Sequence, residues 1–167
     1  DAAWAEWNQR RDGWLADPNH SARVRLIETT LRALPDILRG TRRATDVMFP
    51  NASMELIEGI YKNNVVADHF NAVLVETLAA HLDDRIAQDP TTRIRILEIG
   101  AGTGGTSSKA FERLAGYRDR LATYCYSDVS KAFLMHAEQR YASIAPYLSY
   151  RVFDVERPLA AQGIEPG

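Results

Sequence analysis

The feature that most constrains the fold is a short apolar segment, RIRILEI at residues 93–99, that runs directly into a glycine-rich turn. The segment is rich in β-branched residues and is bounded by Pro90 and Gly100, which predicts a strand. The glycine-rich stretch at 100–106 leads into a helical pattern that ends near Gly116. A strand that passes through glycines into a helix is the junction at which open α/β sheets bind ligands.

The same alternation repeats toward the end of the chain. LATYCYSDV at 121–129 predicts a second strand, residues 130–145 a second helix with Ser130 as its N-cap, and LSYRVFDV at 148–155 a third strand. Strands that alternate with helices of about a dozen residues predict right-handed βαβ units and a parallel sheet. In the usual doubly wound order the first strand lies in the middle, so we expect its second edge to lack a partner and the given sequence to lack the remaining half of the fold.

The first half of the chain carries helical periodicity instead. We therefore divide the sequence into a helical linker or lid region at 1–89 and an α/β region at 90–167. Trp4, Trp7 and Trp14 recur three and seven residues apart, which places them on one stripe of a helix. This stripe predicts a packing seam in preference to a cofactor site.

Three further elements follow in the helical region. We expect a helix that begins at Ser21 and bends or stops at Pro35, and then a loop at 41–52. A longer helix at 66–87 has one apolar face, which we expect to be the buried one. Its members are Phe70, Val73, Leu74, Thr77, Leu78 and Leu82.

Composition excludes several classes of function. Twenty Lys and Arg against 22 Asp and Glu give a net charge of -2, which argues against binding to a nucleic-acid backbone. The single cysteine, Cys125, cannot form an internal disulfide, and four scattered histidines predict no metal site. No apolar run approaches the roughly 20 residues of a membrane span. We expect a cytoplasmic protein without a membrane or nucleic-acid partner.

The chemistry of the sequence concentrates at three strand ends. Gly100, Gly102 and Gly105 form a Gly-x-Gly-x-x-Gly pattern, which alone is weak evidence for a nucleotide-binding site. The helix that follows offers free backbone amides to an anionic group. Asp128 ends the second strand, where a carboxylate can accept hydrogen bonds from both hydroxyls of an adenosine ribose. Asp154 follows the third strand, where it could meet an adenine amino group. Together they predict an adenosine-containing cofactor.

Glu98 helps to choose among such cofactors. Dinucleotide folds usually place an apolar residue two positions before the first glycine, whereas a carboxylate suits a ligand that carries an amino group. This favours S-adenosylmethionine, which has an ammonium and a sulfonium, and leaves NAD as an alternative. ATP is disfavoured because the loop does not end in Gly-Lys-Ser or Gly-Lys-Thr.

These motifs resemble those of a known family. ILEIGAGTGGTS at 96–107 resembles the first motif of class I S-adenosylmethionine-dependent methyltransferases. YSDVSKAFLMHAEQRY at 126–141 and YRVFDVERPLAAQGI at 150–164 are similar, more specifically, to methyltransferase domains of polyketide synthases and hybrid megasynthases. The segment 60–82 is similar to the helical lid that precedes the fold in those domains. The resemblance covers roughly residues 45–165.

The resemblance implies an α/β fold in which a helical lid precedes the first half of a Rossmann-like core, with strands 1–3 of its parallel sheet. It assigns the cofactor loop to the glycine motif, the ribose to Asp128 and the adenine edge to Asp154, with Tyr61 of the lid as a weaker candidate. The cofactor-binding candidates are Glu98, Gly100, Ala101, Gly102, Thr103, Gly104, Asp128, Val129, Asp154 and Tyr61.

The resemblance also implies the reaction. The methyl group of S-adenosylmethionine would pass to the α-carbon of a β-ketoacyl chain, held as a phosphopantetheine thioester on an acyl carrier protein beside neighbouring synthase domains. The catalytic histidine of the family is expected beyond Gly167, so we assign that role to none of the four histidines here and expect no turnover by these 167 residues alone. The alternatives are methylation of oxygen or nitrogen, a catalytically inactive structural remnant, and an NAD-dependent oxidoreductase.

Overall fold

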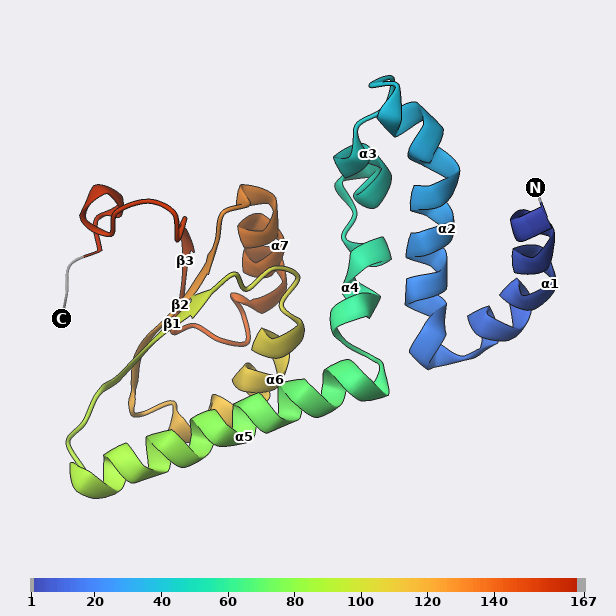
Figure 1. The fold of residues 1–167 in the computed structure, drawn as a ribbon. Helices are drawn as coiled ribbons and strands as arrows, with labels where there is room; N and C mark the ends of the chain where they lie inside the picture. The colour runs from blue at the N-terminus through green and yellow to red at the C-terminus, as the bar shows by residue number, and fades with distance from the viewer. Residues whose placement is uncertain (1, 165–167) are drawn as a thin grey trace. The chain divides into compact units, whose positions relative to one another are not determined.

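The computed structural model describes residues 2–164, which form two compact units divided between Ala72 and Val73 (Figure 1). The first unit is entirely helical and the second contains the sheet. Helix α5 (Val65–Gln88) contributes to both units, because the boundary between them follows Ala72, within this helix. The division at residue 89 predicted above marks the change from helices to alternating strands and helices. Within residues 2–164, none of the helices has the length and apolar character of a membrane span.

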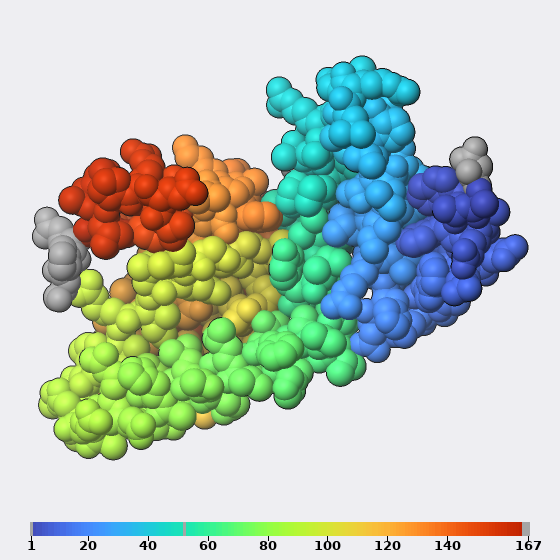
Figure 2. Space-filling view, in the orientation of Figure 1, coloured from blue at the N-terminus to red at the C-terminus, as the bar shows by residue number. Residues whose placement is uncertain are grey.

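The first unit is built around one long helix. Helix α1 (Ala2–Ala16) packs on α2 (Pro18–Leu38), and the two lie side by side in the space-filling view (Figure 2). Helices α3 (Ala44–Met48) and α4 (Glu55–Tyr61) also contact α2. Gly59 permits the close packing of α4 on α2, because a Cβ atom there would lie 2.6 Å from the Cβ of Ala22.

The predicted boundaries of the second helix and of the loop after it are wrong. Helix α2 begins at Pro18, because Asp17 accepts the Asn19 amide at 2.9 Å and proline suits the first turn. The helix continues through Pro35 to Leu38, so the single backbone donor that this proline removes does not end it. The predicted loop at 41–52 contains α3 and a 3-10 turn (Pro50–Ala52), and Val47 of α3 is buried.

The predicted tryptophan stripe is confirmed. Trp7 lies between Trp4 and Trp14, with ring centroids 6.1 and 5.3 Å apart in edge-on contacts. The guanidinium of Arg32 on α2 lies 4.3 Å above the ring of Trp4 and also pairs with Glu28 at 2.8 Å. Aromatic edges and a cation over an aromatic face stabilise the α1–α2 pair, as expected for a packing seam.

The second unit has the predicted alternation of strands and helices. Strand β1 (Ile94–Ile99), helix α6 (Gly105–Leu114), strand β2 (Leu121–Asp128), helix α7 (Lys131–Tyr141) and strand β3 (Leu148–Val152) follow in order. The sheet is parallel throughout, with the strand order β1-β2-β3. Strand β1 therefore lies at one end of the described sheet, with β2 on its paired edge.

One face of this sheet is covered by helices. The core contains side chains from α5, α6 and α7 packed against the strands, with Tyr126 of β2 wholly buried at its centre. On β1, Leu97 and Ile99 alternate onto the opposite face, where they are exposed.

The predicted buried face of the long helix is wrong in most of its members. Helix α5 buries Val75, Ala79 and Leu82, whereas Phe70 and Leu74 of the predicted face are exposed. The helix has apolar residues on more than one side, so periodicity alone does not select the side that packs. Ala79, with no exposed surface, allows the closest approach to the core.

The register brings the functional segments to one edge. Ile99 lies opposite Ser127, and Asp128 lies opposite Val152, so the carboxyl ends of all three strands reach the same edge of the sheet. The glycine-rich loop, Asp128 and the segment after β3 are therefore neighbours in a row along this edge.

Candidate cofactor site at the carboxyl edge of the sheet

The glycine-rich loop between β1 and α6 has a backbone that requires glycine. Gly100, Gly102 and Gly104 have φ angles of +70°, +58° and +77°, in the left-handed region that side chains disfavour. The Ala101 amide donates to the carbonyl oxygen of Ser127 at 2.9 Å, which ties the loop to the end of β2. The loop thus turns tightly and leads into the N-terminus of α6, where amides of the first turn have no partner within the helix.

Asp128 is bonded directly to this loop. Its carboxylate accepts the amide of Gly102 at 3.0 Å through one oxygen and the amide of Ser130 at 2.8 Å through the other. The residue is only 6% exposed. A carboxylate has about four acceptor positions, so two backbone donors leave capacity for two hydroxyl groups of a ligand. The structure therefore brings together two of the predicted binding elements, the glycine loop and Asp128.

Asp154 follows β3 and is held by a residue that the sequence did not single out. Its amide donates to the Oε1 atom of Gln162 at 2.8 Å, while the Nε2 atom of Gln162 donates to the Asp154 carbonyl oxygen at 2.8 Å. The Asp154 side chain accepts the amide of Glu156 at 2.9 Å. Gln162 thus fixes the turn that carries Asp154, and no local pattern in the sequence signals this contact.

Exposed apolar side chains surround the two aspartates along the same edge. Val129 follows Asp128 directly and is 64% exposed, while Ile99 at the end of β1 is 53% exposed. Val155, next to Asp154, is 68% exposed. Val129 was predicted as a cofactor contact. Ile99 and Val155 were not, although the sequence already places both at the ends of predicted strands. Apolar surface next to carboxylates suits a flat heterocycle with polar edges.

Thr103 is the buried polar residue of the loop. It is 3% exposed, and its Oγ1 atom is buried without a hydrogen-bond partner among the described residues. A buried hydroxyl of this kind is unusual, since buried polar atoms nearly always have partners. The space over Gly100 is open, because a Cβ atom there would have no neighbour within 4 Å. These features fit an adenosine-containing cofactor bound across the loop.

Glu98 is held by hydrogen bonds from the neighbouring strand and helix. Its carboxylate accepts the hydroxyl of Ser107 on α6 at 2.8 Å and the hydroxyl of Tyr124 on β2 at 2.9 Å. Burial raises the pKa of this carboxyl, and the two hydroxyl donors partly offset the increase. Glu98 therefore connects β1, β2 and α6, and its predicted role toward the cofactor stays a prediction.

This environment gives Glu98 a defined pH dependence. Because its pKa is raised in the folded state, the stability that the carboxyl contributes is greatest below its ordinary pKa of 4.5 and declines as the pH rises toward the folded value. We expect the unfolding free energy of the wild type, minus that of Glu98→Gln, to fall across this range and to level off above it. Urea unfolding at a series of pH values measures this difference. Glu112→Gln, on the exposed side of α6, is the control, and a difference that rises with pH would contradict the expectation.

Tyr61 lies in the other unit. It is the last residue of α4, its side chain is 56% exposed, and its carbonyl oxygen accepts the side-chain amide of Asn71 at 3.0 Å. The remaining nine candidates all lie in the second unit, on β1, the loop after it, the end of β2 and the turn after β3. The role of Tyr61 toward the cofactor stays a prediction.

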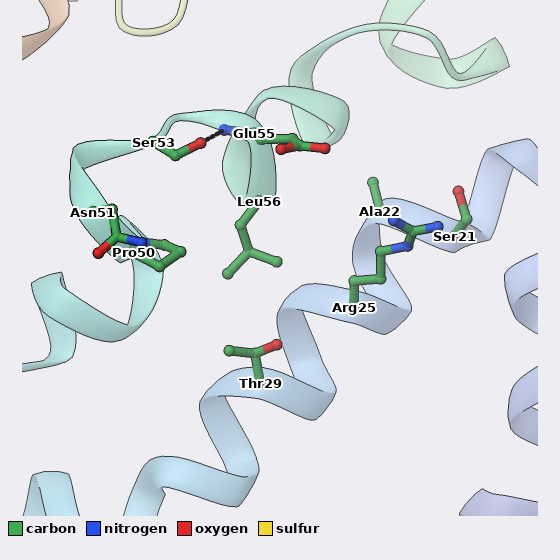
Figure 3. A pocket seen from close by; sticks show the side chains of 9 residues that line it. All are labelled: Ser21, Ala22, Arg25, Thr29, Pro50, Asn51, Ser53, Glu55 and Leu56. Carbon is green, nitrogen blue, oxygen red and sulfur yellow. Dashed lines mark hydrogen bonds between the residues drawn. The ribbon is translucent and has the colours of Figure 1, made fainter.

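The first unit has a cavity of its own. It has a volume of about 590 Å³ and lies between α2 and the segment that leads into α4 (Figure 3). Leu56 extends into it from α4, and the Ser53 hydroxyl accepts the Glu55 amide at 3.2 Å on its rim. The residues around the cavity are Ser21, Ala22, Arg25, Thr29, Pro50, Asn51, Ser53, Glu55 and Leu56, and none is a cofactor candidate.

Known proteins with a similar sequence or fold are polyketide synthases and carbon methyltransferases. No family model matches the chain. Over 164 residues, 98% of its length, it is 56% identical to the polyketide synthase PksM of Bacillus subtilis (strain 168), of which it spans 4%. The crystal structure of the DszA carbon methyltransferase matches 95% of the chain at 37% identity with a TM-score of 0.84. That of the CurJ carbon methyltransferase matches 93% at 26% identity with a TM-score of 0.81.

These relatives are longer than the chain. It spans 41% of the DszA methyltransferase chain and 40% of the CurJ chain. The two structural matches cover nearly all of the given sequence. In sequence and in fold, the chain matches part of the methyltransferase domains of polyketide synthases.

Proposed function

We propose that this chain provides the S-adenosylmethionine-binding part of a methyltransferase that acts on carbon. The observation that carries the proposal is the bond between Asp128 and the amide of Gly102, which joins the two predicted cofactor elements into one site. The relationship to two carbon methyltransferases supports methyl transfer and favours carbon as the acceptor.

Each part of the site has a task in binding. Asp128 would accept the two ribose hydroxyls, Asp154 would accept the adenine amino group, and Ile99 and Val129 would contact the flat base. The left-handed loop and the first-turn amides of α6 would hold the amino-acid end of the cofactor. S-adenosylmethionine supplies an electrophilic methyl group when it is bound. The chain's own residues therefore orient the donor and shield one side of it from water.

We propose a β-ketoacyl thioester on an acyl carrier protein as the acceptor, within a synthase whose neighbouring domains build that chain. The relatives that support this are polyketide synthases. Removal of the α-proton needs a base, and no residue of this chain is assigned to it. Methylation of oxygen or nitrogen remains the nearest alternative, because the site described here binds the donor and does not select the acceptor.

The cofactor is tested by calorimetric titration of the purified protein with S-adenosylmethionine and, separately, with NAD. We expect saturable binding of S-adenosylmethionine alone. Binding of NAD alone would replace the proposal with a dehydrogenase, and binding of neither by a folded protein would indicate a structural remnant. Incubation of this chain together with its native continuation, a carrier-bound β-ketoacyl chain and isotopically labelled S-adenosylmethionine, followed by fragmentation mass spectrometry of the released acid, then distinguishes carbon from oxygen methylation.

A further inference from the structure

Two buried tyrosines lie beneath the glycine loop. Tyr126 of β2 has no exposed surface, and Tyr141, the last residue of α7, is 2% exposed. Their ring centroids are 6.5 Å apart. They come from different elements, and the fold brings both hydroxyl groups to the core side of the loop, opposite the side on which the cofactor would bind.

Tyr126 and Asp128 both form hydrogen bonds with Gly102. Its hydroxyl donates to the carbonyl oxygen of Gly102 at 2.8 Å, while the amide of Gly102 donates to Asp128 at 3.0 Å. Gly102 is thus fixed through both of its polar backbone atoms, in a left-handed conformation with φ of +58°. Without the phenol, the carbonyl group could rotate and draw the amide away from Asp128.

Tyr141 supports the next glycine of the loop. Its hydroxyl donates to the carbonyl oxygen of Gly104 at 3.4 Å. The approach is close, because a Cβ atom on Gly104 would lie 2.7 Å from the Tyr141 hydroxyl and 3.2 Å from the Tyr126 hydroxyl. The backbone at Gly104 therefore rests directly on both phenols.

Burial keeps the phenol of Tyr126 in the donor form. It raises the pKa of Tyr126, and the nearby Glu98 carboxylate raises it further. A protonated hydroxyl that faces a carbonyl oxygen can only donate, so its direction is fixed.

We infer that Tyr126 and Tyr141 are positioning residues for the cofactor, which set the conformation of the glycine loop through Gly102 and Gly104. This inference rests on the proposed function for its consequence, because it assigns to the pair an effect on S-adenosylmethionine affinity. The phenols themselves do not touch the cofactor. They act through the loop, and Tyr126 in addition acts through the Gly102–Asp128 bond.

The test compares Tyr126→Phe and Tyr141→Phe with Tyr150→Phe. Tyr150 lies on β3, packs against Tyr126, and has a long 3.5 Å bond from its hydroxyl to Ala137, away from the loop. Calorimetric titration with S-adenosylhomocysteine measures affinity. We expect Tyr126→Phe to weaken binding by about five- to tenfold, as the loss of one neutral hydrogen bond would. Tyr141→Phe should weaken it by less, because its bond is longer, and Tyr150→Phe should leave it within about twofold.

A second measurement does not require a ligand. Amide hydrogen exchange of the free protein should be faster at residues 100–105 in Tyr126→Phe and unchanged in β3, since the loop loses its fixed carbonyl. Equal affinity and equal loop exchange in Tyr126→Phe and Tyr150→Phe would overturn the inference. If the wild type binds no S-adenosylhomocysteine, the proposed function fails, and unchanged loop exchange would separately overturn the positioning role.

Discussion

Replacement of Asp128 by alanine is expected to weaken S-adenosylmethionine binding by about a hundredfold or more. The carboxylate accepts the amides of Gly102 and Ser130 and, in the proposed complex, the ribose hydroxyls as well. A hydrogen bond to a charged group contributes about 1.5–3 kcal/mol, and about 1.4 kcal/mol corresponds to a tenfold change in affinity. Loss of the ribose contacts together with the loop anchor is therefore expected to lower the affinity for S-adenosylmethionine by more than a hundredfold. Calorimetric titration of the purified protein measures the change.

Two variants serve as references for this experiment. Asp128→Asn keeps one acceptor oxygen and should lose less affinity than alanine. Asp119→Ala removes an exposed aspartate before β2, at the other edge of the sheet, and should bind as the wild type does. Circular dichroism checks that each variant is folded. An Asp128→Ala protein that is folded and binds normally would remove Asp128 from the site.

Replacement of Gly104 by alanine is expected to lower the unfolding free energy by about 2–5 kcal/mol. A left-handed backbone costs about 1–2 kcal/mol for a residue with a side chain, and φ at this position is +77°. Added volume in a packed interior costs about 1–3 kcal/mol more. The new Cβ atom would meet the Tyr141 hydroxyl at 2.7 Å and its Cε2 atom at 3.0 Å, within a buried part of the fold. Urea unfolding measures the loss.

Alanine variants of two other glycines distinguish the cost of the left-handed backbone from the cost of the steric contact. Gly100→Ala has a similar left-handed φ of +70° with open space around the new atom, so only the backbone cost applies. Gly116→Ala has no neighbour within 4 Å and should change stability little. The double variant Gly104→Ala with Tyr141→Phe should recover part of the loss, because it removes the nearest atom. Equal losses in the Gly104 and Gly116 variants would contradict the close approach.

The sequence alone determined the local features of this protein. The alternation of strands and helices after residue 93, the parallel sheet and the glycine-rich turn were all predicted, because each depends on neighbouring residues in the chain. The place of Asp128 beside the loop also followed, since parallel strands bring their carboxyl ends to one edge. Resemblance of the motifs then indicated the family.

The tertiary structure decided which groups meet across elements. The side of α5 that packs, the inward direction of Glu98 toward Ser107 and the contact of Gln162 with Asp154 all join residues that no local pattern relates. In the sequence, Tyr126 of β2 has the pattern of an ordinary core residue. It supports the loop only because the fold places its hydroxyl 2.8 Å from the carbonyl oxygen of Gly102. The partners of buried polar groups, like the packed side of a helix with apolar residues on more than one side, depend on contacts between distant segments, where hydrogen bonds must be satisfied in three dimensions.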